Sequence, residues 1–361
     1  MKEMKSQAAV QFRPNEETVL TEVDLEEPRP DEVLVKVIAC GICHTDISIR
    51  DNSSYYPTVL GHEGSGIIEK VGTNVKNVKI GDHVVLAYTY CGECEACKEG
   101  KTYECDHFSQ FFHGFRTDNT SPLATTNGTS ISALMRQGAF ASYAVCHKHS
   151  ITKIDEELDL RMVGTLGCGL MTGAGTVLNY LKPDKGKAFV VFGVGSVGLA
   201  SVMAAKISGC DPIIAVDRLE FKLDMARQVG ATHCINGDAS SDLEETILDS
   251  CDGVDYGFDT TGSQKLLTVL QAVLNNGATA CGVGGGLIVL TQKERNEGKS
   301  WGHVDAGGAI PQVFIPQLID YYREGKFPFD MLIRFFSFKE INEAMDASQK
   351  GMVIKPVLMM D

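Results

Sequence analysis

The clearest chemical signal in the sequence is a group of four cysteines within one short segment. They follow the spacing Cys-x-x-Cys-x-x-Cys-x7-Cys and comprise Cys91, Cys94, Cys97 and Cys105. Thiolates prefer soft or borderline metals, and four of them close a tetrahedral zinc site with no open position. An iron–sulfur cluster or a merely cysteine-rich surface loop are the alternatives, but this spacing is not one of the ferredoxin-type runs. The pattern therefore favours a structural zinc.

A glycine-rich turn gives the second signal. Gly193, Gly195 and Gly198 form Gly-x-Gly-x-x-Gly directly after the apolar run 188–192 and at the start of the helical pattern 196–208. Such glycines permit a tight turn, close approach of a pyrophosphate to the backbone, and close packing of the helix whose N-terminus faces the phosphates. This context predicts a dinucleotide-binding site.

Asp217 ends the next predicted strand and indicates which dinucleotide binds there. A carboxylate at this point can accept hydrogen bonds from both ribose hydroxyls and would repel a 2′-phosphate. Arg218 is a counter-signal, because an arginine can tolerate that phosphate, and a simple turn-forming acid is the other interpretation of Asp217. We expect NAD rather than NADP.

Three further segments carry possible metal ligands. The segment 40–46 contains two cysteines, a histidine, a threonine and an aspartate. Gly61-His62-Glu63-Gly64 places a histidine and an acid between glycines, and Gly167-Cys168-Gly169 places a cysteine between glycines. Cysteine and histidine are the common zinc ligands. Each of these side chains taken alone is more often packed or solvated, and their wide spacing leaves their convergence open.

The surrounding pattern predicts how these residues are positioned. The first part of the chain reads as strands and turns, for example 32–38, whereas 188–192, 196–208 and 213–216 alternate between strand and helix patterns. Alternation of that kind is the βαβ signature of a parallel sheet. We therefore expect an α/β protein with three segments: a β-rich domain over 1–170, a doubly wound nucleotide-binding domain over 171–309, and a return to the first domain over 310–361.

Composition excludes several classes of protein. The 361 residues carry 33 Lys and Arg against 47 Asp and Glu, a formal net charge of −14. A nucleic-acid-binding face needs basic residues, so this balance argues against a nucleic-acid partner. No apolar run reaches the roughly 20 residues of a membrane span, and the segment 1–5 lacks the apolar stretch of a signal peptide. Together with twelve cysteines, which suggest metal or redox chemistry, this favours a cytoplasmic protein.

Taken in order, the motifs are similar to those of zinc-containing medium-chain alcohol dehydrogenases. The matching segments are Cys43-His44-Thr45-Asp46, Gly61-His62-Glu63-Gly-x-Gly66, the four-cysteine lobe, Gly167-Cys168 and the Gly193 turn, which together span essentially the whole chain. The resemblance implies a GroES-like β-rich catalytic domain, a Rossmann domain, two zinc ions per chain, NAD, and a homodimer or homotetramer. It also implies that Cys43, His62 and Cys168 hold a catalytic zinc with an open fourth position for water or the alcohol.

The resemblance further implies roles for the neighbouring residues. Asp46 would orient His62, Glu63 would assist exchange of ligands at the metal, and Thr45 would take the alcohol proton. Ser48 stands where many relatives place the histidine that passes this proton on. The remaining cofactor contacts implied by the family are His44, Thr172, Val197, Lys222, Val283 and Lys355, with Lys355 expected at the pyrophosphate.

The substrate expected from the resemblance is a bulky primary alcohol. The C-terminal run from Pro311 onward is similar to the aryl-alcohol (benzyl alcohol) dehydrogenases, and Ala87 replaces a bulky aromatic found in several relatives. Leu134 and Met135 would add apolar wall. The rival enzymes are a zinc polyol or secondary-alcohol dehydrogenase and a glutathione-dependent formaldehyde dehydrogenase. A nucleotide-binding protein of this fold without catalysis is the rival from another class, and a zinc-finger module is disfavoured by the net charge.

Overall fold

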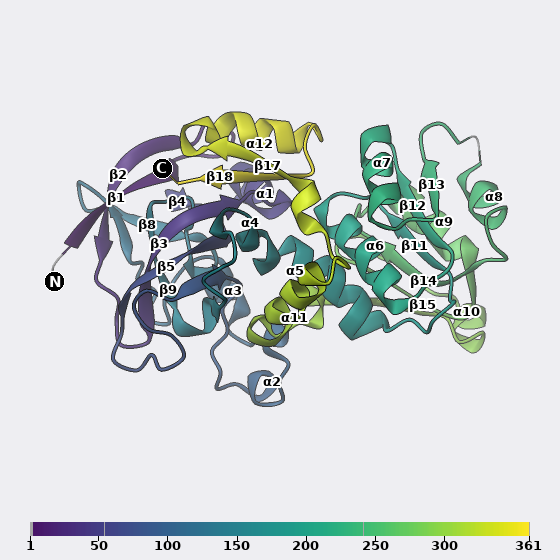
Figure 1. The fold of residues 1–361 in the computed structure, drawn as a ribbon, viewed down its shortest axis with the longest axis horizontal. Helices are drawn as coiled ribbons and strands as arrows, with labels where there is room; N and C mark the ends of the chain where they lie inside the picture. Colours follow the sequence, from purple (N-terminus) through teal and green to yellow (C-terminus); the bar gives the residue numbers. More distant parts are fainter. Residues whose placement is uncertain (1–2, 54, 241, 361) are drawn as a thin grey trace. The chain divides into compact units, whose positions relative to one another are not determined.

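The computed structural model describes residues 3–53, 55–240 and 242–360, and the chain divides into two compact units (Figure 1). The first unit contains residues 1–168, 310–316 and 333–361, and the second contains 169–309 and 317–332. Residues 169–170 and 317–332, which were expected in the β-rich domain, group with the second unit. No described helix combines the length and the apolar character that crossing a membrane requires.

The first unit is built from a small barrel and a seven-stranded sheet. The closed barrel has the order β1 (Glu3–Gln11), β2 (Val19–Glu26), β7 (Leu123–Thr125), β8 (Ser130–Ala133) and β4 (Thr58–Val59). The sheet has the order β10 (Ile151–Lys153), β6 (His83–Leu86), β5 (Glu63–Val71), β3 (Glu32–Gly41), β18 (Lys355–Met359) and β17 (Ile333–Ser337), with β9 (Tyr143–His147) paired to β3. Its core is a single cluster of buried aliphatic side chains shared by barrel and sheet.

Short helices complete the first unit. These are α1 (His44–Asn52), α2 (Glu95–Lys98), α3 (Phe108–Phe112), α4 (Leu160–Val163) and α12 (Ile341–Gln349). The C-terminal strand β18 pairs antiparallel with the end of β3, so that Val357 lies opposite Gly41. This pairing brings the last part of the chain beside the segment that carries Cys43.

The second unit is a six-stranded sheet in which every pair of neighbours is parallel. The strand order is β13 (His233–Asn236), β12 (Ile213–Asp217), β11 (Phe189–Phe192), β14 (Val254–Asp259), β15 (Leu274–Gly282) and β16 (Ser300–His303). Between them along the chain run α6 (Ser196–Ser208), α7 (Glu220–Val229), α8 (Leu243–Leu248), α9 (Gln264–Val273) and α10 (Gln292–Asn296), while α5 (Gly169–Gly175) precedes the sheet. The predicted mixed α/β class is confirmed.

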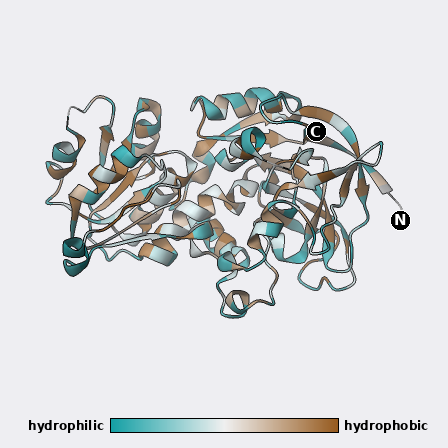
Figure 2. Cartoon of the chain, turned by 180° about the vertical axis from the view of Figure 1, so that it is seen from behind, coloured by the Kyte–Doolittle hydropathy of each residue, from teal (hydrophilic) through white to brown (hydrophobic). Residues whose placement is uncertain are grey.

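Hydropathy explains this layering. All four residues of β11 are fully buried, as expected for a strand covered on both faces of a parallel sheet. Figure 2 shows the strands of the second unit largely hydrophobic and the short helix α10 hydrophilic. The helix α11 (Pro311–Arg323) begins in the first unit and ends in the second, because its first residues group with one and its last residues with the other.

Candidate metal centre and nucleotide-binding turn

Three of the predicted ligands converge in the first unit, together with an acid. Cys43 precedes α1, His62 and Glu63 stand at the start of β5, and Cys168 follows the 3₁₀ turn Gly164–Gly167. One ligand atom from each of these four side chains lies within 4.8 Å of all the others. Residues 125 positions apart in the sequence are thus gathered at one point, with two sulfur donors, one nitrogen and one carboxylate.

The orientation of His62 shows that this group of residues fits a metal ion. Its Nδ1 lies 3.0 Å from Asp46 Oδ1, and the same carboxylate accepts the backbone N–H groups of Gly61 and Cys43 at 2.9 Å each. Asp46 and His62 are fully buried. Among the described residues, His62 Nε2 has no hydrogen-bond partner. A buried imidazole held by a carboxylate on one nitrogen and open on the other is the arrangement of a zinc-ligating histidine.

The two cysteines at this centre form an electrostatically coupled pair. A hydrogen bond from Cys168 lowers the pKa of Cys43 well below its usual range, although burial opposes this. The same interaction, followed by burial, raises the pKa of Cys168. The Cys43 thiolate is therefore favoured even without a metal ion, and a divalent cation would stabilise the thiolates of both cysteines.

Lys355 forms a buried ion pair that the sequence did not predict. The resemblance implies a pyrophosphate contact for this residue, which stays a prediction, and in the structure its ammonium group pairs with Glu63, at 2.9 and 2.8 Å from the two carboxylate oxygens. Lys355 is 1% exposed and Glu63 is fully buried, and Lys355 Nζ also donates to the carbonyl of Ile42 at 3.3 Å. Burial disfavours a charge on either group, so each charge depends on the other.

The other predicted residues of the first unit lie on α1. Thr45 Oγ1 is 3.8 Å from Cys43 Sγ and is partly buried, whereas His44 and Ser48 are exposed. Thr45 is thus beside the metal ligands. The roles of His44 and Ser48 toward a cofactor and a proton stay predictions.

The four cysteines of the lobe are also gathered as predicted. Their sulfur atoms lie within 4.8 Å of one another around the short helix α2. Backbone N–H groups of Glu93 and Cys94 lie 3.3 Å from Cys91 Sγ, and that of Cys91 lies 3.3 Å from Cys105 Sγ. Backbone N–H groups of Asp106 and Cys97 lower the pKa of Cys94 to about 6. Four sulfurs supported by N–H donors fit a closed structural zinc site.

In the second unit, the glycine turn has the predicted geometry. Gly193 has φ of +85°, which a side chain would strain, and a Cβ on Gly198 would lie 2.0 Å from the Gly193 carbonyl oxygen. The open space at Gly195 leaves the N-terminus of α6 accessible, since nothing lies within 4 Å of a Cβ built there. The strand order around β11 is that of a dinucleotide-binding sheet, with its switch point between β11 and β14.

Asp217 closes this turn from the end of β12. Its Oδ2 accepts the N–H of Val194 at 2.8 Å, and its Oδ1 accepts the N–H groups of Arg218 and Leu219 at 2.8 and 3.0 Å. The Arg218 side chain is exposed. These hydrogen bonds hold the carboxylate beside the glycine turn, and the carboxylate can still accept a further hydrogen bond. The remaining predicted cofactor contacts of this unit are partly buried and comprise Thr172, Val197, Lys222 and Val283.

The three residues expected to line an apolar wall are buried, and a polar residue that sequence reasoning missed contacts one of them. Ala87 and Leu134 are buried and Met135 is 9% exposed. Gln137 is also buried and donates from Nε2 to the Ala87 carbonyl at 2.7 Å. No motif in the sequence marks Gln137, because its contact depends on the path of two distant segments.

Comparison with known proteins finds matches over both units of the chain. Residues 29–156 match the alcohol dehydrogenase GroES-like domain, and residues 196–299 match the zinc-binding dehydrogenase domain. A geraniol dehydrogenase from Castellaniella defragrans is 34% identical over 98% of each chain. An S-(hydroxymethyl)glutathione dehydrogenase from Paracoccus denitrificans is 33% identical over 99% of this chain and 100% of its own. Among solved structures, benzyl alcohol dehydrogenase from Acinetobacter calcoaceticus is 38% identical with a TM-score of 0.94, covering 99% of this chain and 100% of its own.

Proposed function

The chain belongs to the zinc-dependent medium-chain alcohol dehydrogenases, and from this premise we propose that it oxidises aryl or allylic primary alcohols to aldehydes. Zinc and NAD are the cofactors of such an enzyme, and its activity is the reversible interconversion of alcohol and carbonyl compound. The observation that carries the catalytic assignment is the convergence of Cys43, His62 and Cys168, in which the buried His62 has an imidazole nitrogen without a hydrogen-bond partner among the described residues. A non-catalytic protein of this fold would have no need of that set.

The residues of the first unit have distinct tasks in this reaction. Cys43, His62 and Cys168 would hold the metal, which when bound acts as a Lewis acid and lowers the pKa of an alcohol. Asp46 fixes the imidazole so that Nε2 points to the ion. Thr45, beside Cys43, would take the proton of the alcohol as hydride leaves its carbon for the nicotinamide.

Two lines of support favour a bulky substrate. The relatives include a geraniol dehydrogenase and a benzyl alcohol dehydrogenase at 34% and 38% identity, and the small residue Ala87 and Leu134 are both buried. The S-(hydroxymethyl)glutathione dehydrogenases, at 33–35% identity, favour a second candidate substrate of that class. We also expect a cytoplasmic homodimer or homotetramer.

Initial rates with benzyl alcohol, geraniol, ethanol and S-hydroxymethylglutathione test this proposal. We expect kcat/KM for benzyl alcohol or geraniol to exceed that for ethanol by about 10–200-fold, since apolar contacts discriminate by roughly 1–3 kcal/mol. Ala87→Phe should lower kcat/KM for the bulky alcohols and leave ethanol nearly unchanged. A higher value for ethanol, or for S-hydroxymethylglutathione, would reject the aryl or allylic assignment while leaving the alcohol dehydrogenase activity intact.

Replacing Asp217 with serine is expected to shift cofactor choice toward NADP. The variant removes the carboxylate that repels a 2′-phosphate and leaves Arg218 beside the site. We expect the ratio of kcat/KM for NADP to that for NAD to rise by about 10- to 100-fold, one to two powers of ten corresponding to roughly 1.4–2.7 kcal/mol. Asp238→Ser, at an exposed acid after β13, is the matched control and should leave the ratio unchanged.

A further inference from the structure

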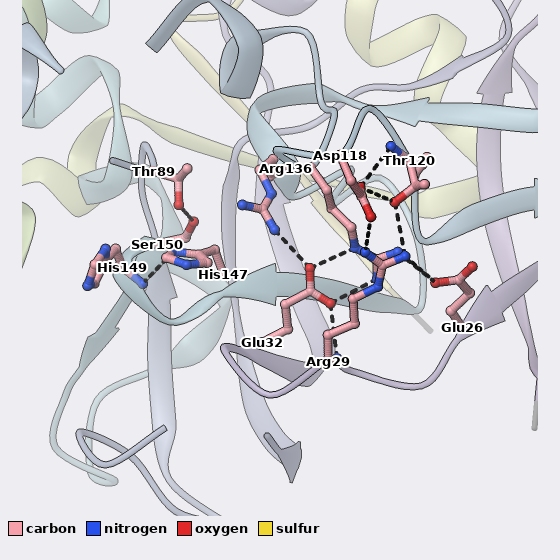
Figure 3. A network of polar contacts seen from close by, with 12 residues as sticks. Glu26, Arg29, Glu32, Thr89, Asp118, Thr120, Arg136, His147, His149 and Ser150 are labelled. Carbon is pink, nitrogen blue, oxygen red and sulfur yellow. Dashed lines mark hydrogen bonds and ion pairs between the residues drawn. The ribbon is translucent and has the colours of Figure 1, made fainter. Parts of the chain in front are cut away.

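A polar pocket lies in the first unit between the base of the cysteine lobe and the strands β3 and β9. Its volume is about 700 Å³. Its cationic lining residues are Arg29, Arg116, Arg136 and Lys148, and His147 and His149 line it as well. We call it the arginine pocket. Figure 3 shows Arg136 and Arg29 on either side of Glu32, with His147 nearby.

Two guanidinium groups share the single buried carboxylate of this pocket. Arg116 Nε and Nη2 donate to the two oxygens of Glu32 at 2.8 Å each, and Arg136 Nη2 donates to Oε1 at 2.8 Å (Figure 3). Burial would raise the pKa of Glu32, but the hydrogen bonds and charges of the two arginines outweigh it and lower that pKa. Glu32 is therefore ionised, and both of its carboxylate oxygens already accept hydrogen bonds from Arg116.

Arg136 is left with less compensation than its neighbour. Arg116 has a second carboxylate, Glu26, at 2.6 Å, whereas Glu32 is the only hydrogen-bond partner of the Arg136 side chain among the described residues. Arg136 is 8% exposed, and burial lowers its pKa. The guanidinium carbon of Arg136 lies 5.3 Å from the centroid of the Phe111 ring, a cation–π contact that compensates part of its charge. The guanidinium still shares its counter-ion and keeps N–H donors that make no hydrogen bond among the described residues.

Two neighbouring acids are paired with other cations, and the remaining lining acid, Glu93, is exposed. Asp31 is paired with Lys148 at 2.8 Å, and Asp118 is paired with Arg29 at 2.6 Å. The backbone of Arg136 is also unusual, because it and Met135 are successive non-glycine residues with φ of +55° and +52°. Such conformations persist only where the surroundings enforce them. The fold thus holds the guanidinium at this pocket at a conformational cost.

His147 adds a neutral donor to the same pocket. Its Nδ1 accepts the backbone N–H of His149 at 3.3 Å, so the ring proton of the neutral form is on Nε2. Burial, followed by the charge of Arg136, lowers the pKa of His147 to about 3, and the ring stays neutral at physiological pH. His147 lies opposite Glu32 in the β3–β9 pairing, which fixes it beside the arginines.

We propose that the arginine pocket is a binding site for a phosphate group, with Arg136 as the principal cation and His147 Nε2–H as a second donor. A guanidinium fork and a ring N–H approaching from another element suit an anion with several acceptor oxygens. This site is independent of the alcohol-oxidising centre, since none of its donors is a ligand or neighbour of Cys43, His62 or Cys168. Its ligand is either free inorganic phosphate or a phosphate monoester.

Calorimetric titration of the zinc-loaded, NAD-saturated enzyme with inorganic phosphate at constant ionic strength tests the proposal. Saturation with NAD keeps phosphate from the Gly193 turn. We expect saturable binding with a Kd of about 1 mM or tighter. Arg136→Lys keeps a cation for Glu32 but loses the fork, and His147→Phe keeps an aromatic ring but loses the donor; each should weaken binding by about tenfold. Arg161→Lys, at an exposed arginine paired with Asp159, should bind as the wild type does.

Thermal unfolding of each variant establishes that it is folded, and His147→Phe decides the matter if Arg136→Lys does not fold. Absence of saturable binding to the wild type would overturn the proposal. Equal binding by the wild type and both pocket variants would also overturn it, because phosphate would then be held elsewhere. A parallel titration with glycerol phosphate distinguishes the two sources: tighter binding than inorganic phosphate assigns the pocket to a phosphate monoester, and weaker binding assigns it to the free ion.

Discussion

Replacing His62 with alanine is expected to lower kcat/KM for alcohol oxidation by at least about 10³-fold and to remove one of two zinc ions per chain. The imidazole is one of the three proposed ligands of the catalytic metal, and its Nε2 is buried with no partner among the described residues. A metal acting as a Lewis acid contributes several kcal/mol to transition-state stabilisation, which corresponds to roughly three powers of ten or more. Steady-state kinetics and elemental analysis of zinc measure the two effects.

His83 offers a matched control for this variant. It also has a ring nitrogen, Nδ1, that is buried without a hydrogen-bond partner, but it belongs to neither described cluster of metal-ligand side chains. His83→Gln should keep both zinc ions and activity close to that of the wild type. The activity of Asp46→Asn should fall between those of the two histidine variants, since loss of a carboxylate that orients a ligating histidine lowers metal affinity or activity by about 10–100-fold. Full activity of His62→Ala with one zinc per chain would show that the catalytic metal site is wrongly assigned.

Replacing Lys355 with methionine is expected to destabilise the enzyme by about 3–5 kcal/mol. The change removes the ammonium group that contacts both oxygens of Glu63 and leaves a carboxylate buried without its cation. A loss of this size lowers the Tm of a domain of this size by about 6–20 °C. Differential scanning calorimetry of the zinc-loaded protein measures it.

A double variant and a surface variant separate this effect from simple loss of packing. Lys355→Met combined with Glu63→Gln removes both charges, so the double variant should be more stable than Lys355→Met alone. Lys350→Met breaks an ion pair with Asp346 in which both side chains are more than half exposed, and should cost at most about 1 kcal/mol. An unchanged Tm for Lys355→Met would show that Glu63 does not depend on this lysine.

The sequence predicted best the sites whose residues lie close together along the chain. The four lobe cysteines lie within one short segment, so their spacing alone indicated a tetrahedral site, and the Gly193 turn follows directly from the strand and helix patterns around it. The order of the strands in the second unit and the mixed α/β class agree with those patterns. The ligands at positions 43, 62 and 168 are different, because no periodicity links them. Their grouping followed only from the family resemblance.

The contacts that the sequence did not predict depend on the register in which distant strands pair. The pyrophosphate role of Lys355 was implied only by the family resemblance, and nothing near this lysine in the sequence indicates that it pairs with Glu63. Its pairing with Glu63 depends on β18 adding to β3 in one particular register. The two-residue strand β4 and the contact of Gln137 with Ala87 likewise depend on distant segments meeting. The grouping of residues 317–332 with the second unit depends on contacts that composition does not encode.

The addition of β18 to β3 also has a consequence for how the enzyme is made in the cell. Glu63 and Lys355 are separated by 292 positions, so a ribosome working at about 5–20 residues per second needs roughly 15–60 s to supply the cation after the acid has been synthesised. The second unit is translated in between and can fold first. Until β18 emerges, the acid beside the metal ligands lacks its cation, and a nascent chain would expose this centre to water. The catalytic metal centre is therefore completed late in biosynthesis, whereas the cysteine lobe can load zinc much earlier.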